Sequence, residues 1–356
     1  MDFDCHESST AHVYEPLSAP GYIRLMRLEP ALSPNTPLRL TSFQADLSHI
    51  EGQYETISYT WGEPKLTCPL YTGHGTCIMV TENLDRALRR LRHRDLVRVL
   101  WADAVCINQA DDKEKETQIP LMVHIYRGAS RVLAWLGSSE QTGYEEKGMQ
   151  SLNRISRRRR PDIRMRSLRA DSPDPNTLDT DVKIHLSEIR DFLTLPWFNR
   201  LWIVQEDVFN VDVLLICGKS ELSWARAIAA LSIMRTTETW DSLSVARDKL
   251  TAIHKMGKLW KYHCSIEYMK LDGTNSFVAK PEEDIVDLVE EFSGYGCSGP
   301  RDRIFALYSM TCDIGPRIEQ FAPIHAFKTV PYRGTPTPAW DHSFYVAMDI
   351  DYSLTV

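Results

Sequence analysis

The sequence lacks the patterns that mark the common metal and nucleotide sites. Its eight cysteines are scattered without a Cys-x-x-Cys pair, and its 11 histidines show no His-Glu-x-x-His spacing. No glycine-rich loop of the Rossmann or Walker kind is present. We therefore expect no metal site, no resident cofactor, and thiols that stay reduced as they do in the cytoplasm.

Long apolar runs and an excess of positive charge are missing as well. The longest apolar stretch that we find, around residues 211–217, has the length of a strand, whereas a membrane helix needs about 20 residues. Residues 1–20 are polar and predict a disordered tail without a secretory signal. The formal net charge of −7 gives no general attraction to nucleic acid. We expect a cytoplasmic protein that uses neither a membrane nor nucleic acid as a partner.

The hydrophobic pattern alternates between strand and helix. Apolar runs predict strands at residues 22–28, 54–62, 96–107 and 131–136, and 3.6-residue spacing predicts a helix at 82–94. Another helix opens at Asp111 and should break or kink at Pro120. This order predicts an α/β fold, in which helices flank a central, mostly parallel sheet.

The composition also suggests how the chain is divided. We expect a main domain at residues 21–218, a helical C-terminal part of the same globule at 219–325, and an irregular tail at 326–356. Residues 138–182 are rich in arginine, including Arg157 to Arg160, and predict a variable, solvated insertion. The alternatives for this run are a nuclear-localisation signal and a phosphate-binding patch.

Four stretches stand out by their aromatic and polar pattern. They are Tyr-Glu-Thr-Ile-Ser-Tyr-Thr-Trp-Gly at 54–62, Leu-Trp-Ala-Asp-Ala-Val-Cys-Ile-Asn-Gln at 100–109, Pro-Trp-Phe-Asn-Arg-Leu-Trp-Ile-Val-Gln-Glu at 196–206, and Gly-Pro-Arg-Asp-Arg-Ile-Phe-Ala-Leu at 299–307. In this order they resemble the heterokaryon-incompatibility (HET) domain of filamentous fungi. The resemblance implies self/non-self recognition that leads to programmed cell death. Such proteins often carry a nucleotide-binding or repeat module beside the HET domain, and none is visible in this sequence, so we expect a triggering protein partner or self-association.

The HET domain in turn resembles TIR domains, which are flavodoxin-like α/β modules that in several branches cleave NAD⁺. Trp202 and Glu206 carry this resemblance, because TIR enzymes have a Trp and a catalytic Glu at the same separation. A separation of four places both side chains on one helical face. The resemblance implies Glu206 as the catalytic carboxylate and NAD⁺ as the substrate, with Trp202 stacking on a base. The alternative is a Trp buried in the core and a Glu that pairs with Arg200 or caps a neighbour.

Further binding residues are expected where strands end. Ligands of doubly wound sheets bind beyond the carboxyl ends of the strands. Ser58, Tyr59, Trp61 and Gly62 follow one predicted strand, and could line a nucleotide site or form a rigid aromatic turn.

The end of the next predicted strand contributes a second set. Asp103, Asn108 and Gln109 should face the same rim, although Asp103 could instead cap a neighbouring loop. Arg200 could hold a phosphate or pair with Glu206 or Asp207.

These residues support three functional hypotheses, in this order. The first is an enzyme that hydrolyses NAD⁺ or a related nucleotide at its N-glycosidic bond. The second is a non-enzymatic death-signalling adaptor that self-assembles or binds a partner. The third is a nucleic-acid-binding regulator that uses the arginine run.

Overall fold

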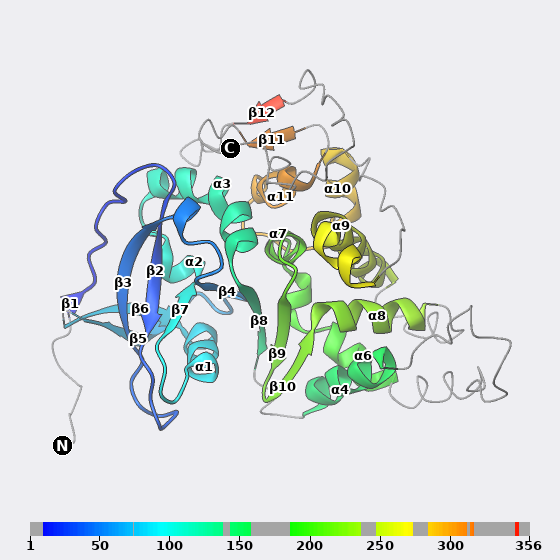
Figure 1. Ribbon diagram of the computed structural model, residues 1–356, viewed down its shortest axis with the longest axis horizontal. Coiled ribbons are helices and arrows are strands. Elements are labelled where there is room, and N and C mark those ends of the chain that lie inside the picture. Colours follow the sequence, from blue (N-terminus) through cyan, green and yellow to red (C-terminus); the bar gives the residue numbers. More distant parts are fainter. Residues whose placement is uncertain are drawn as a thin grey trace, which may run out of the picture.

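A ten-stranded sheet is the centre of the structure within the described ranges (Figure 1). The computed structural model describes residues 10–73, 75–137, 143–157, 186–235, 247–272, 284–311, 314–316 and 346–348. The strands are β1 (Thr10–Ala11), β2 (Tyr22–Leu28), β3 (Arg39–Asp46), β4 (Glu55–Tyr59), β5 (Leu66–Thr72), β6 (Thr76–Thr81), β7 (Arg98–Trp101), β8 (Arg131–Gly137), β9 (Val213–Cys217) and β10 (Ser220–Ser223). Their order across the sheet is β1-β6-β5-β3-β2-β7-β4-β8-β9-β10.

Helices pack against both faces of this sheet. They are α1 (Glu82–Leu91), α2 (Asp103–Cys106), α3 (Asp112–Gly128), α4 (Tyr144–Ser156), α6 (Leu186–Leu193), α7 (Trp202–Val208), α8 (Trp224–Met234), α9 (Arg247–Asp272), α10 (Ile285–Glu291) and α11 (Asp302–Phe305). Three short 3₁₀ helices are η1 (Leu47–His49), η3 (Pro196–Asn199) and η5 (Tyr308–Met310). Strands β11 (Ile314–Pro316) and β12 (Val346–Met348) form a separate parallel pair. None of the helices in these ranges is long and apolar enough to span a membrane.

Four neighbouring strands, β7, β4, β8 and β9, run parallel to one another. Antiparallel pairs β2–β7, β2–β3, β5–β6 and β9–β10 extend the sheet towards its edges. The predicted α/β fold with a mostly parallel central sheet and a helical C-terminal part is therefore confirmed. Figure 1 shows α7 between the sheet and helix α9.

The two faces of the sheet bury two separate apolar clusters, because side chains along a strand alternate between the faces. In β8, Val132 and Ala134 join the cluster that includes α3 and α7, whereas Leu133 and Trp135 join the cluster under α1. In β4, Ile57 belongs to the α1 cluster. Ser58, the next residue along the strand, therefore points to the α7 face.

The strand predicted at 96–107 and the break predicted at Pro120 differ from the structure. The predicted strand 96–107 ends at Trp101, because Ala102 and Asp103 turn the chain into α2, where the Asp103 carboxylate accepts a hydrogen bond from the Ala104 backbone N–H at 2.8 Å. The predicted break at Pro120 is wrong, since α3 continues through it. The missing hydrogen bond of Pro120 costs less than exposing the apolar residues that α3 buries on both sides of it.

The predicted insertion 138–182 contains a packed helix. Helix α4 occupies residues 144–156 and buries Met149, Leu152 and Ile155 in the main apolar cluster. Residues 158–182, which include most of the arginine run, lie outside the described ranges. The arginine-rich composition of 138–182 as a whole hid the helical spacing of these three apolar residues.

Gly148 lets α4 approach α6 closely, and its substitution tests this packing. A Cβ atom at Gly148 would lie 2.2 Å from the Glu188 carbonyl oxygen and 2.6 Å from the Cβ of Phe192. Gly148→Ala is therefore expected to lower the free energy of unfolding by about 1–3 kcal/mol, as overpacking does, even though alanine favours helix. Chemical denaturation measures this change. Gly294→Ala is the matched control, because a Cβ at Gly294 meets nothing within 4 Å. Equal stabilities of the two variants would contradict the close packing.

Candidate functional site

The Glu206 carboxylate is buried against the centre of the sheet. The Ser58 hydroxyl donates a hydrogen bond of 2.5 Å to Oε2 of Glu206, and the Trp197 indole N–H donates one of 2.9 Å to Oγ of Ser58. Only 2% of Glu206 is exposed, while Ser58 and Trp197 are fully buried. Residues of β4, η3 and α7 thus form one hydrogen-bonded chain that ends at a carboxylate.

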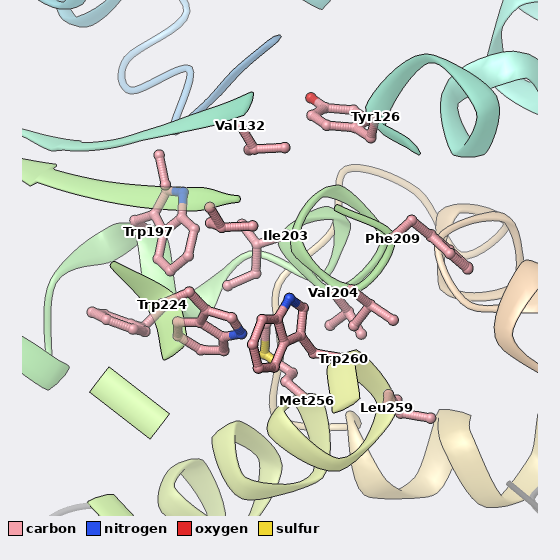
Figure 2. Close-up of a cluster of buried hydrophobic side chains, with 14 of the residues drawn as sticks. Tyr126, Val132, Trp197, Ile203, Val204, Phe209, Trp224, Met256, Leu259 and Trp260 are labelled. Carbon is pink, nitrogen blue, oxygen red and sulfur yellow. The ribbon is translucent and has the colours of Figure 1, made fainter. Parts of the chain in front are cut away.

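Apolar packing of α7 places this carboxylate. Ile203 and Val204 of α7 are fully buried, and they lie with Trp197, Trp224 and Trp260 in the cluster shown in Figure 2. The rings of Trp197 and Trp224 meet edge to face with their centroids 6.5 Å apart. Because these contacts fix the rotation of α7 about its axis, the side chain of Glu206 is directed at β4.

Arg200 lies beside Glu206 and is the nearest positive charge. Its Nη2 is 3.9 Å from Oε1 of Glu206, and its side chain is 20% exposed. The sequence left open whether Arg200 pairs with Glu206 or Asp207, and the structure shows the pair with Glu206. Asp207 is buried with no hydrogen-bond partner among the described residues for either carboxylate oxygen. Burial and the adjacent Glu206 raise the pKa of Asp207 well above its ordinary value.

A second carboxylate, Asp103, stands near the end of β4. The Trp61 indole N–H donates a hydrogen bond of 2.8 Å to Oδ2 of Asp103, so the aromatic turn after β4 is tied to α2. Burial and the charge of Asp103 raise the pKa of the Tyr59 hydroxyl well above its ordinary value. Burial and the charge of Glu206 do the same for Tyr126. Two tyrosines, two carboxylates and one arginine therefore share one region of the structure.

Hydrogen bonds from buried residues hold the α2–α3 loop, which carries the predicted rim residues. Arg24 is 3% exposed and donates hydrogen bonds of 2.8 Å both to the Cys106 carbonyl and to Glu114. Glu114 also accepts the Asn108 backbone N–H at 2.7 Å. Removing one partner of such a buried pair is strongly destabilising, so Arg24 anchors this loop. This role of Arg24 was not predicted, because an arginine in a strand that alternates apolar and basic residues is expected to face the solvent.

The remaining predicted site residues make local bonds. The Gln109 amide donates to the Asp103 carbonyl at 2.9 Å, and Oδ1 of Asn108 accepts the Ala110 N–H at 3.2 Å. Gly62 adopts a φ of +75°, which favours glycine because a Cβ is strained there. The structure therefore brings Ser58, Tyr59, Arg200 and Glu206 together, with Trp61 and Asp103 at the rim. It places Asn108, Gln109 and Gly62 in turns around them.

The indole that hydrogen-bonds to Ser58 is that of Trp197, and the stacking role expected of Trp202 stays a prediction. Trp202 is half-buried against the main apolar cluster, and no hydrogen bond, ion pair or ring contact found in the described ranges joins it to Glu206. Trp197 instead reaches Ser58. Both tryptophans belong to the stretch 196–206, and their spacing alone does not tell which one faces the sheet. Tyr126, in the apolar stripe of α3, was missed for the same reason.

The environment of Glu206 changes its acidity. Burial raises its pKa from 4.5 to about 7, while the Arg200 charge and the Ser58 hydrogen bond oppose this shift and the Asp103 charge adds to it. Near neutral pH the carboxyl group can therefore either hold or release a proton. This property is expected of a carboxylate that exchanges protons or that changes its protonation state when a charged ligand binds.

The raised pKa predicts a pH-dependent effect of Glu206→Gln on stability. Between pH 4.5 and 7 the folded wild type keeps a proton that the unfolded chain releases. The free energy of unfolding of wild type therefore falls as the pH rises through this window, by up to about 3 kcal/mol. The neutral Gln lacks this loss, so the stability of the variant relative to wild type should increase from pH 5 to pH 8.

Chemical denaturation at several pH values measures the trend. Glu221→Gln, which removes the same charge from the surface strand β10, is the control for charge loss alone. A stability difference between Glu206→Gln and wild type that stays constant from pH 5 to pH 8 would contradict the raised pKa.

Comparison with known proteins places the site in a family segment. Residues 54–206 match the family described as Heterokaryon incompatibility protein (HET). This segment begins one residue before β4 and ends at Glu206. It thus contains the Ser58–Glu206 hydrogen bond, Trp197 and Arg200.

One curated relative supports the same assignment. The chain is 28% identical over 249 residues to Heterokaryon incompatibility protein 6, OR allele, of Neurospora crassa. The match covers 62% of this chain and 36% of that protein, so the chain spans about a third of its relative's length. No solved structure matches the chain. The resemblance carried by the four sequence stretches is thus supported by a match of residues 54–206 to the heterokaryon-incompatibility (HET) family and by one curated relative.

Proposed function

We propose that the chain is a self/non-self recognition module of the heterokaryon-incompatibility type, which triggers programmed cell death by hydrolysing the N-glycosidic bond of NAD⁺. The family match over residues 54–206 and the printed name of the Neurospora relative support the biological role. The observation that carries the chemistry is the buried Glu206 carboxylate, held by Ser58 and flanked by Arg200. The proposal places the protein in the cytoplasm, where a partner or self-association controls it.

The reaction needs a negative charge beside the ribose. Water adds to the ribose C1′ as the C1′–N bond breaks, the bonding electron pair leaves with neutral nicotinamide, and one proton is released. The transition state resembles an oxocarbenium ion, which a carboxylate in a water-poor site stabilises strongly. Glu206 is the buried carboxylate of the segment that accepts a hydrogen bond from the β4 strand end, and we assign it this role.

The raised pKa suits this role. The ionisation of a carboxyl group with a pKa of about 7 costs little free energy when a cation is placed next to it. The nicotinamide ring of NAD⁺ carries a positive charge, and the sugar gains one in the transition state. Trp61, about a third exposed at the end of β4, and the half-buried Trp202 offer aromatic faces for the bases.

One observation favours the non-enzymatic adaptor as the second candidate. Ser58 and Asp103 already form hydrogen bonds to Glu206 and Trp61, as residues with a purely structural role do. An adaptor signals through surfaces that assemble with another copy or a partner. In that case Glu206 contributes to the packing of α7 on the sheet, and its isosteric replacement leaves cell death unchanged.

Nicotinamide release from NAD⁺ tests the enzymatic proposal. Wild-type protein at high concentration should release nicotinamide, with a rate that rises with pH through about 7 as Glu206 ionises. Glu206→Gln should lower the rate at least about 100-fold, because the charge that stabilises the transition state is gone. Glu221→Gln should retain the wild-type rate, since β10 lies at the sheet edge.

Expression of the same variants in a fungal host tests the biological role. Growth arrest by wild type and by Glu221→Gln, but not by folded Glu206→Gln, supports cell death through hydrolysis. Growth arrest by all three, together with absent nicotinamide release, contradicts hydrolysis and supports the adaptor.

A further inference from the structure

The head group of Arg200 lies beside Glu206, but its N–H donors form no hydrogen bond within the described part of the chain. The guanidinium carries five such donors. Its closest polar contact is the 3.9 Å approach to Glu206, which is longer than a hydrogen bond. Only 20% of the side chain is exposed, so water reaches a small part of the head group.

Other partly or fully buried arginines behave differently. Arg24 donates four hydrogen bonds, to Glu114 twice, to the Cys106 carbonyl and to the Glu15 carbonyl. Arg98 donates two to Glu55 and one to the Leu91 carbonyl. Arg24 and Arg98 therefore direct their donors to carboxylates and carbonyls, and Arg200 differs from these two residues.

The backbone at Arg200 is nevertheless held tightly. The Gly296 N–H donates to the Asn199 carbonyl at 2.6 Å, and the Leu201 N–H donates to the Gly296 carbonyl at 2.9 Å. These two bonds come from a segment almost one hundred residues later in the chain, between α10 and α11. The C-terminal helical part thus fixes the position of a residue whose head group remains available.

The surrounding charges indicate what the head group is for. Arg200 lies near Glu206 and Asp103, and both carboxylates favour its charged form. Ser58 donates a hydrogen bond to Glu206 and Trp61 donates one to Asp103, and among the described residues neither carboxylate accepts a hydrogen bond from Arg200. The guanidinium of Arg200 is planar and charged, and the backbone of this residue is held in place. Such a group can donate two parallel hydrogen bonds to a phosphate or a carboxylate.

We propose that Arg200 binds the phosphate of the ligand at the Glu206 site, so that this site takes phosphorylated nucleotides and discriminates against nucleosides. The inference rests on the proposed function for the nature of the ligand. It adds a specificity-determining residue and the chemical group that this residue recognises. The positive charge of Arg200 also offsets the negative charge of Glu206. When the Glu206 charge is removed, the guanidinium attracts an incoming anion more strongly.

Binding titrations of the full chain with ADP-ribose, adenosine and inorganic pyrophosphate test the inference. Wild type should bind ADP-ribose at least about 10-fold more tightly than adenosine, as expected for a charge-assisted bidentate contact. Arg200→Gln should reduce this ratio to near one, and Arg200→Lys, which keeps the charge and loses the fork, should give an intermediate ratio. Pyrophosphate that competes with ADP-ribose only at far higher concentration shows that the base and sugar are also recognised.

Two further variants sharpen the test. Arg131→Gln removes the same charge at the opposite end of β8, where Arg131 pairs with Asp212, and should keep the wild-type ratio. Glu206→Gln should strengthen ADP-ribose binding several-fold, because the competing carboxylate is neutralised. Circular dichroism and thermal unfolding establish that each variant is folded.

Several outcomes overturn the inference. They are equal binding of ADP-ribose and adenosine, binding of neither, pyrophosphate that competes as well as ADP-ribose, or an unchanged ratio in folded Arg200→Gln and Arg200→Lys. Failure of the proposed hydrolysis is distinguishable, because no turnover enters these titrations. ADP-ribose binding through Arg200 in a protein that releases no nicotinamide contradicts hydrolysis and supports the phosphate site.

Discussion

The burial of one carboxylate is the constraint on which the site depends. The side chain of Glu206, a residue of α7, faces β4 and has almost no access to water. Burial of a charged carboxylate costs free energy unless the group is hydrogen-bonded or paired. Ser58 from β4, itself held by Trp197, supplies the hydrogen bond, and Arg200 supplies the nearby charge. Sheet, η3 and α7 must therefore keep their relative positions for the carboxylate to be tolerated at all.

The same constraint explains why distant segments are tied together around the site. Trp61 joins the end of β4 to α2 through Asp103, and Arg24 holds the α2–α3 loop through Glu114. Gly296 reaches back to the chain on both sides of Arg200. These contacts restrict the conformational freedom of the chain. They hold a carboxylate and a guanidinium side by side with little access to solvent. Preorganised charge of this kind is most useful when a charged ligand enters.

Much of the fold could be predicted because strand and helix periods are local. The alternation in β2 and β4, the apolar run of β8 and the stripe of α1 all appear in the sequence, and all became elements of the expected type. The errors also have local causes. Pro120 reads as a helix breaker, although tertiary burial on both sides of it keeps α3 intact. The arginines after residue 156 obscured the three buried apolar residues of α4.

The sequence by itself determined the fold class, the resemblance to the HET domain, and the presence of Ser58, Arg200 and Glu206 among the candidate residues. Only the tertiary structure decided that Trp197, not Trp202, reaches Ser58, and that Gly296 holds the backbone at Arg200. The physical reason is the range of each interaction. Periodicity and motif spacing report which residues share a helix face or a strand end. The rotation of α7 on the sheet and the 148-residue separation of Ser58 from Glu206 depend on packing across the whole globule.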